Sequence, residues 1–196
     1  ALAPIVLFVY NRPRHTQQCL DALSKNKEVS ESLLYVFADG AKENCTPEEL
    51  AKIKEVRQII RDRQWCGEVR IVEADKNKGI AQSVVHGVSQ VLNSHESVIV
   101  LEDDVVTSKG FLKYMNRALS LYRHEEKVMH VSGFMFPVKI RLPETFFLCS
   151  APPWGWGTWA RAWRLYNSEA KELMNRINES GRRHEFNFNG VDDYYG

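Results

Sequence analysis

The sequence lacks several short patterns that mark common classes of protein. It has no Cys-x-x-Cys pair and no paired histidines near a cysteine, so a zinc site is not expected. The first apolar run, VLFVYN (6–11), is not followed by Gly-x-Gly-x-x-Gly, which argues against an NAD-binding turn. The same run holds no Asp-x-Asp, so a phosphatase-type hydrolase is not indicated either.

Long blocks of one charge are also missing. Lys and Arg number 26 and Asp and Glu 25, which gives a net charge of +1, and the longest basic run is Arg182-Arg183. This distribution argues against a nucleic-acid-binding surface. The apolar runs have the length of strands, so no transmembrane segment is expected, and no signal peptide pattern is present.

The four cysteines are spread along the chain, at Cys19, Cys45, Cys66 and Cys149. A domain of 196 residues can bury a core large enough to be stable without disulfides. We therefore expect reduced thiols and a cytoplasmic location.

What the sequence does contain is an alternation of short apolar runs and helical patterns. Thr46, Pro47 and Glu49 form a capping box at the start of one predicted helix. The predicted strands are 3–10, 33–40, 69–74, 97–104, 128–134 and 145–150. The predicted helices between them are 14–26, 46–63, 79–94 and 108–125.

This alternation predicts an α/β fold with a mostly parallel sheet and helices on both faces. In open sheets of this class, ligands bind beyond the carboxyl ends of the strands. Polar residues follow four of the predicted strands, at 10–12, 39–40, 75–79 and 102–104. The sequence therefore predicts a ligand site at this edge of the sheet.

Three adjacent carboxylates end the fourth predicted strand. Glu102, Asp103 and Asp104 follow the apolar residues VIVL (98–101). Two carboxylates about 4 Å apart repel each other by roughly 1 to 4 kcal/mol, so a counter-charge or a proton is needed. Mg²⁺ or Mn²⁺ on one or two carboxylates would leave positions open for substrate phosphates. An acidic entry to the following helix is the alternative explanation.

Several segments together resemble GT-A glycosyltransferases. VLEDDVVTSKGFLKYM (100–115) resembles their DXD-type segment, PIVLFVYNRP (4–13) their first strand and NKGIAQSVVHGVSQVL (77–92) their Asn-x-Gly helix. PWGWGTWARAW (153–163) is similar to a tryptophan- and glycine-rich segment that two groups of these enzymes carry. These groups are bacterial family-2-like sugar transferases and the N-acetylglucosaminyltransferases that start complex N-glycans.

The resemblance implies a GT-A (Rossmann-like) fold, a nucleotide-sugar donor, expected to be a UDP-sugar, and Mn²⁺ or Mg²⁺ as cofactor. Asp104 matches the direct metal ligand of the Glu-Asp-Asp pattern. The acceptor partner would be a saccharide or another hydroxyl compound. Of the four tryptophans in the 153–163 segment, Trp156 is assigned to the site and the others to packing. The residues expected to bind the nucleotide-sugar are Arg12, Asp39, Lys78, Gly79, Ser83, Glu102, Asp103 and Trp156.

Inverting transfer needs a carboxylate that takes the proton of the acceptor hydroxyl. By the resemblance this base lies beyond the tryptophan segment, where Asp192 and Asp193 are the candidates, with Glu185 or a residue beyond Gly196 as alternatives. We expect residues 1–135 to form the nucleotide-sugar-binding half and 136–196 an acceptor-side segment of the same domain, truncated at its C-terminus.

Two other functions remain open at this point. A sugar nucleotidyltransferase would carry a glycine- and arginine-rich loop after the first strand, but VYNRPRHT (9–16) has no glycine. A non-catalytic nucleotide- or carbohydrate-binding module could use the tryptophans together with calcium at 102–104. Turnover of a nucleotide-sugar with Mn²⁺ would distinguish an enzyme from such a module.

Overall fold

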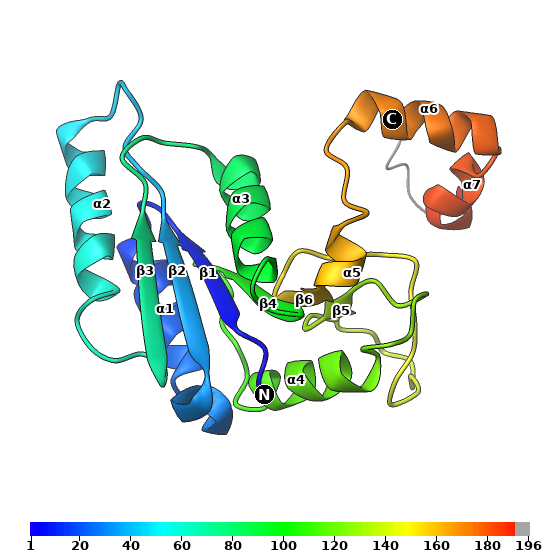
Figure 1. Ribbon diagram of the computed structural model, residues 1–196, viewed down its shortest axis with the longest axis horizontal. Coiled ribbons are helices and arrows are strands. Elements are labelled where there is room, and N and C mark those ends of the chain that lie inside the picture. The colour runs from blue at the N-terminus through cyan, green and yellow to red at the C-terminus, as the bar shows by residue number, and fades with distance from the viewer. Residues whose placement is uncertain (191–196) are drawn as a thin grey trace. The chain divides into compact units, whose positions relative to one another are not determined.

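The computed structural model describes residues 1–190, and strands alternate with helices along most of this length (Figure 1). The first elements are β1 (Ile5–Val9), α1 (Pro13–Leu23), η1 (Lys27–Glu31), β2 (Leu33–Ala38), α2 (Pro47–Ile59), β3 (Glu68–Glu73), α3 (Ile80–Leu92) and β4 (Ser97–Glu102). The later elements are α4 (Phe111–Leu121), β5 (Val131–Ser132), β6 (Trp156–Trp159), α5 (Ala160–Trp163), α6 (Ala170–Ser180), α7 (Arg183–Phe186) and η2 (Phe188–Gly190).

Six strands form one sheet in the order β3-β2-β1-β4-β6-β5. The strands β1 to β4 are parallel, with Phe8 opposite Glu102 and Ala38 opposite Glu73, whereas β6 runs antiparallel to both β4 and β5. The chain builds β2 and β3 on one side of β1 and β4 on the other. The boundary between β1 and β4 is therefore the topological switch point of the sheet.

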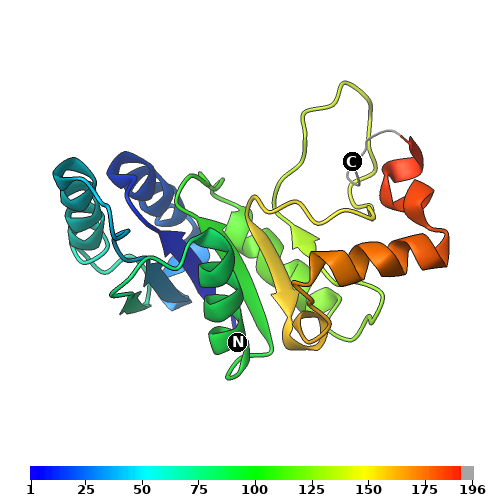
Figure 2. The ribbon, with the colours of Figure 1, turned by 90° about the horizontal axis from the view of Figure 1, so that it is seen from above.

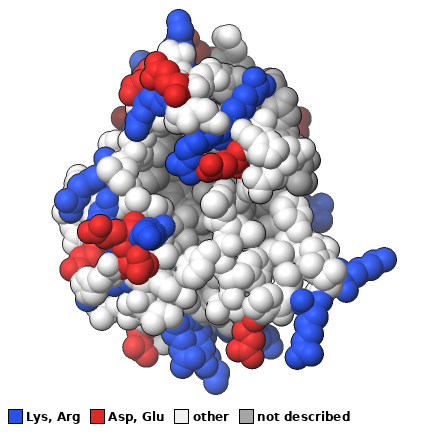
Figure 3. All heavy atoms as spheres, turned by 90° about the vertical axis from the view of Figure 1, so that its right-hand side faces the viewer, with Lys and Arg blue, Asp and Glu red and all other residues white. Residues whose placement is uncertain are grey.

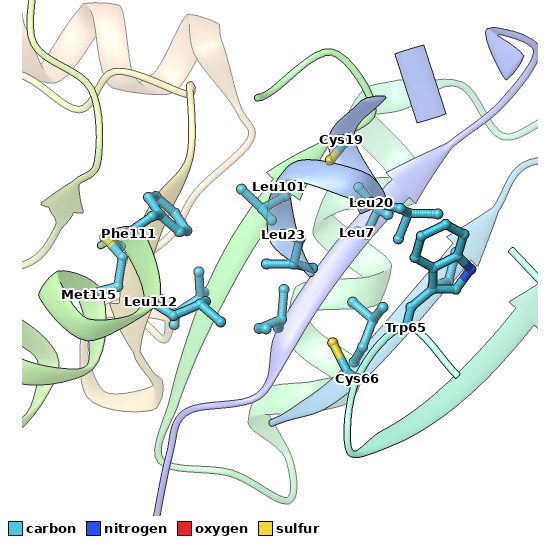
Figure 4. Packing of buried hydrophobic residues seen from close by; sticks show 14 of the residues in the cluster. Leu7, Cys19, Leu20, Leu23, Trp65, Cys66, Leu101, Phe111, Leu112 and Met115 are labelled. Atoms are coloured by element: carbon cyan, nitrogen blue, oxygen red, sulfur yellow. The ribbon is translucent and has the colours of Figure 1, made fainter. Parts of the chain in front are cut away.

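Helices cover both faces of the sheet because its central strands are apolar on both sides. On one face, Leu7 and Leu101 pack with residues of α1 and α4, among them Leu20, Leu112 and Met115 (Figure 4). Figure 2 shows α1 and α2 on this side of the sheet and α3 on the other. The predicted α/β class, with a mostly parallel sheet between helices, is confirmed.

The opposite face of the sheet packs against α3. Phe8 and Phe37 stack there with ring centroids 5.6 Å apart, and Val88 and Val91 of α3 belong to the same buried cluster. Gly87 lets α3 approach this close, because a Cβ at that position would lie 2.8 Å from the Phe8 ring.

The start of α2 shows how local sequence sets an element. The Thr46 hydroxyl accepts a hydrogen bond from the Glu49 N–H at 3.2 Å, and the Glu49 carboxylate accepts one from the Thr46 N–H at 2.9 Å. This reciprocal pair satisfies two of the N–H groups that a helix leaves without partners. The predicted capping box is confirmed.

The last two strands that were predicted along the chain are wrong, one in part and one entirely. Residues 145–150 form no strand, and only Val131–Ser132 of the predicted 128–134 strand is paired. A strand that the sequence did not predict, β6, lies between β4 and β5.

The tryptophan-rich segment forms β6 because its alternate residues suit the space beside β4. Trp159 is 2% exposed, and its indole N–H donates to the carbonyl of Leu119 at 3.0 Å. A Cβ on Gly157 would lie 3.0 Å from the Val98 carbonyl oxygen. A small residue is therefore favoured where β6 meets β4.

The chain divides into two compact units. The first contains Ala1–Met135 and Pro152–Trp163 and holds the whole sheet. The second contains Phe136–Ala151 and the chain from Arg164 onward. The chain thus leaves the first unit after Met135 and returns to it at Pro152 to add β6.

The surface carries charges of both signs. On the face shown in Figure 3, Lys and Arg side chains are interspersed with Asp and Glu. Within residues 1–190, no helix is both long and apolar enough to cross a membrane.

Candidate active site

The carboxyl ends of β1 to β4 lie at one edge of the sheet, because these strands are parallel and in register. The polar segments predicted to form the site follow these ends directly. They are residues 10–12, 39–40, 75–79 and 102–104. The segments after β1 and β4 meet at the topological switch point, where a ligand is expected in this class of sheet.

The three carboxylates form a tight turn at the end of β4, which we call the acidic tip (Glu102, Asp103 and Asp104). The Val105 N–H donates to the Glu102 carbonyl at 3.0 Å and closes the turn. The Asp103 side chain is 3% exposed, whereas that of Asp104 is 43% exposed. The turn therefore buries one carboxylate and presents the next one to solvent.

Arg12, the residue before α1, supplies the counter-charge. Its Nη1 donates to Asp104 Oδ2 at 3.0 Å, and its Nη2 forms a short ion pair with Asp103 Oδ1. The guanidinium bridges the ends of β1 and β4, which are adjacent in the sheet. Its planar fork suits two carboxylate oxygens at once.

One arginine does not balance three carboxylates. Burial raises the pKa of the Glu102 carboxyl, and the charges of Asp104 and Asp103 raise it further. Burial also raises the pKa of Asp103, against the opposing effect of its ion pair with Arg12. The acidic tip therefore retains an excess of negative charge that a bound cation would lower.

Cys19 and Asn26, which were not predicted to belong to the site, hold the acidic tip and the segment after it in place. The Cys19 thiol donates to the Glu102 carbonyl at 3.6 Å, and burial raises the pKa of Cys19 to about 12, so it stays a thiol. Asn26 is 2% exposed, donates to Thr107 Oγ1 at 3.4 Å and accepts from the Leu112 N–H at 3.0 Å. Asn26 thereby ties the segment after the tip to the start of α4.

Asp39, at the end of β2, makes a different set of contacts. Its Oδ1 accepts from the N–H groups of Gly40 and Lys78, at 2.8 and 2.9 Å. Its Oδ2 accepts from the Gly79 N–H at 3.0 Å and from Asn77 Nδ2 at 2.9 Å. A carboxylate has about four acceptor positions, so internal donors satisfy this one fully. Its predicted contact with the nucleotide stays a prediction.

The segment before α3 is shaped by glycines. Gly79 has φ +75°, a conformation that a residue with a Cβ avoids. A Cβ on Gly40 would lie 2.5 Å from the Lys76 backbone, so a glycine allows the two strand-end segments to touch. The Lys78 side chain is exposed at this edge, and Ser83 is half-buried one turn into α3.

The tryptophans occupy different surroundings. The Trp156 ring stacks on His130, with centroids 5.5 Å apart, and lies 6.0 Å from the Trp163 ring. Trp154 is instead 46% exposed and lines a cavity of about 480 Å³ together with Asp104 and Phe111. Trp154 was predicted to be a packing residue; its exposure beside the acidic tip is a feature that the sequence pattern did not reveal.

The predicted catalytic bases Asp192 and Asp193 lie outside the described residues. The alternative base, Glu185, is in α7 of the second unit and forms an ion pair with Arg182 at 2.8 Å. The identity of the base stays a prediction.

No protein-family model matches the sequence, and no curated protein matches it. Among solved structures, S. aureus TarS is similar at a TM-score of 0.46 and 18% identity, over 80% of this chain and 28% of that chain. A 4-diphosphocytidyl-2C-methyl-D-erythritol synthase gives 0.46 and 13%, over 92% and 85%. The galactosyltransferase LgtC, in complex with donor and acceptor sugar analogs, gives 0.45 and 10%, over 89% and 65%.

This chain spans less than half of the two similar TarS chains, 28% of one and 49% of the other. Structural similarities with TM-scores below 0.5 do not assign a function, which therefore depends on the side chains of the site.

Proposed function

We propose that this protein is a metal-dependent glycosyltransferase that moves a sugar from a nucleotide-sugar, expected to be a UDP-sugar, to an acceptor hydroxyl. One observation carries the proposal. The acidic tip and Arg12 meet at the topological switch point, and the exposed carboxylate of Asp104 faces a cavity of about 480 Å³. Carboxylates and an arginine in this place suit a metal ion and the diphosphate that it would bind, and the cavity beside them leaves room for a second molecule, the acceptor.

The donor atoms at the tip suit Mg²⁺ or Mn²⁺. Both ions prefer oxygen ligands, and Mg²⁺ commonly takes one or two carboxylates and completes its shell with water and substrate phosphates. Asp104 is the exposed carboxylate, and Glu102 carries a raised pKa that a nearby cation would lower. Within residues 1–190, no cluster of three or more His, Cys, Asp or Glu side chains could hold a metal, so water and the substrate would have to supply the remaining ligands of the ion.

Asp104, with Glu102 as the second candidate, would therefore hold the metal. When bound, the ion would act as a Lewis acid on the charge that develops on the leaving diphosphate. Asp103 keeps the Arg12 guanidinium in place at the mouth of the site, because it is buried and paired with it. Arg12 is 44% exposed and can turn part of its fork toward a phosphate.

The transfer step is a substitution at the anomeric carbon. The acceptor oxygen forms a bond to this carbon, the bond from the carbon to the diphosphate oxygen breaks, and the nucleoside diphosphate keeps the electron pair. The hydroxyl proton passes to a carboxylate base, for which Asp192 and Asp193 are the candidates. A single displacement of this kind inverts the configuration of the sugar.

A thermal-shift screen tests the proposal. UDP-, GDP- and dTDP-sugars are added with and without Mn²⁺. A ligand present at one hundred times its Kd stabilises the fold by about 2.7 kcal/mol, or roughly 5–10 °C for a chain of this size. We expect such a rise with a UDP-sugar and Mn²⁺ together.

Asp104→Ala should lose this rise and keep the melting temperature of the ligand-free protein, while Asp62→Ala, an exposed aspartate outside the site, should behave as wild type. Release of UDP in the presence of an acceptor then separates an enzyme from a binding module. A Mn²⁺-dependent shift without any turnover would support the module, and an unchanged shift in Asp104→Ala would overturn the metal assignment.

A further inference from the structure

The residues that line the cavity beside Asp104 come from α4 and from the segments after β4, after β5 and before β6, and none comes from β1 or the segment after it. The residues after β5 and before β6 form its far wall, with Phe134 and Trp154, and residues 105–108 form the near wall. Asp104 therefore contacts Arg12 of the β1 side and also lines this cavity. If a donor diphosphate occupies the Arg12 side, the cavity is the place left for the molecule that accepts the sugar.

Hydrogen bonds and ring contacts hold the walls of the cavity in place. The Gly133 N–H donates to the Gly155 carbonyl at 2.7 Å and joins the two segments that carry the aromatic residues. The rings of Phe134 and Trp154 meet edge to face with centroids 4.9 Å apart. A Cβ on Gly133 would lie 2.4 Å from the Phe111 ring, so this glycine makes room for that ring in the wall.

Hydrogen-bonding groups are few and gathered on one side. Asp104, Thr107 and Ser108 lie on the near wall, and the Thr107 hydroxyl already accepts from Asn26. The far wall offers mainly aromatic rings. A bare monosaccharide with four or five hydroxyls would leave several of them without partners here, which would weaken its binding.

The charge of the site narrows the choice further. Three carboxylates face a single arginine at the tip, which disfavours an anionic molecule in the adjoining cavity. Val106, at 65% exposed, and Trp154, at 46%, are apolar side chains left open to solvent on this surface. An uncharged molecule with an apolar ring would cover them and gain from that burial.

We propose that the cavity binds the acceptor and that this acceptor is a neutral compound with an aryl group close to its reactive hydroxyl. That the bound molecule is an acceptor rests on the proposed function. The preference of the cavity for an aryl group does not depend on donor or metal. The hydroxyl would lie at Asp104 and the aryl group between Phe134, Trp154 and Phe111.

Ligand-observed saturation-transfer NMR tests the preference without donor or metal. The probes are phenyl β-glucopyranoside and methyl β-glucopyranoside, which share the sugar and differ in the aryl group. We expect the phenyl compound to bind at least ten-fold more tightly, with the strongest saturation on its aryl protons. Equal binding of the two, binding through sugar protons alone, or no binding of either would overturn the proposal.

Variants locate the binding. Trp154→Ala should weaken binding of the phenyl compound at least ten-fold, and Trp154→Phe should restore most of it. Tyr114→Ala is the matched control, because Tyr114 is an aromatic residue on α4 with 49% exposure that does not line the cavity. Unchanged binding in Trp154→Ala would refute this location. A failed donor screen with intact aryl binding would instead count against the proposed enzyme alone.

Discussion

Asp39 beyond β2 and Asp104 beyond β4 lie at the same edge of one sheet, but they differ in what their carboxylates contact. Asp39 accepts four hydrogen bonds from its surroundings, three of them from backbone N–H groups. Asp104 contacts one guanidinium and is 43% exposed. An aspartate at a strand end can thus complete the fold or remain open to a ligand, and the supply of nearby donors decides which.

The surroundings of Asp39 and those of the acidic tip also predict different effects of substitution. Around Asp39, the cost of burying a charge is met by donors that come from the segment before α3. Around the acidic tip, burial and like charge raise the pKa values of Glu102 and Asp103, and Arg12, with a smaller contribution from His15 at Asp103, opposes this. We therefore expect substitutions near Asp39 to change stability and substitutions at the tip to change ligand binding.

The largest effect on stability is expected from Asp39→Ala. It leaves three backbone N–H groups without their acceptor and removes one of the two acceptors of the Asn77 side-chain amide, which should lower the free energy of unfolding by about 2–4 kcal/mol. Urea denaturation measures this loss. The exposed neighbour Asp75 provides the control, and Asp75→Ala should stay within about 0.5 kcal/mol of wild type. If Asp39→Ala is as stable as wild type but loses nucleotide binding, Asp39 belongs with the ligand-binding residues instead.

A smaller and pH-dependent effect is expected from Arg12→Met. The variant leaves the Asp103 carboxylate, which is 3% exposed, without its counter-charge. Removing one partner of a fully buried pair costs about 3–5 kcal/mol, and since Arg12 is half-exposed we expect about 1–3 kcal/mol at pH 7.5.

The sign of the pH dependence follows from Asp103. Burial raises the pKa of this carboxyl in the folded state, and loss of Arg12 raises it further. Because the unfolded state is the same in both proteins, the loss relative to wild type is full above the folded pKa of Asp103 in the variant and disappears as the pH falls below its folded pKa in wild type. Urea midpoints at pH 4.5, 6 and 8 should converge on wild type toward low pH. Arg14→Met, which removes an exposed arginine in the first turn of α1, should show no such trend. An equal loss for Arg12→Met at all three pH values would count against the buried ion pair.

The sequence predicted those parts of the fold that local patterns determine. The capping box of Thr46 and Glu49 spans four residues, and each of the strands β1 to β4 could be predicted from its own apolar run. It did not predict β6, because Trp156–Trp159 becomes a strand through its pairing with β4, more than fifty residues earlier in the chain.

The site shows the same division. The strand-end positions of Arg12, Asp39 and the acidic tip were predictable, since parallel strands bring their carboxyl ends together. Their contacts were not, because Asp39 meets donors 38 to 40 residues away and Arg12 meets Asp103 across 91 residues. The exposure of Trp154 and the burial of its neighbour Trp159 likewise depend on how β6 docks.

The smallest effect compares two glycines that precede helices. Gly79 and Gly110 are the N-cap residues of α3 and α4, and neither has an atom within 4 Å of where a Cβ would lie. They differ in backbone conformation, with φ +75° at Gly79 and −102° at Gly110. Gly79→Ala should therefore cost about 1–2 kcal/mol, while Gly110→Ala should be neutral or stabilise by up to about 1 kcal/mol.

The same glycine can show whether Asp39 holds the segment before α3 in place. The Gly79 N–H donates to Asp39 Oδ2 at 3.0 Å, so the left-handed conformation and this hydrogen bond exist together. Once Asp39→Ala has released the segment, a second change at Gly79 should cost less than it does alone. We expect the double variant to lose at least about 0.5 kcal/mol less than the sum of the single losses, as residues in contact do. Strict additivity in urea denaturation would mean that Gly79 keeps its conformation without Asp39, and the stabilising role of this aspartate would then be smaller than its four contacts suggest.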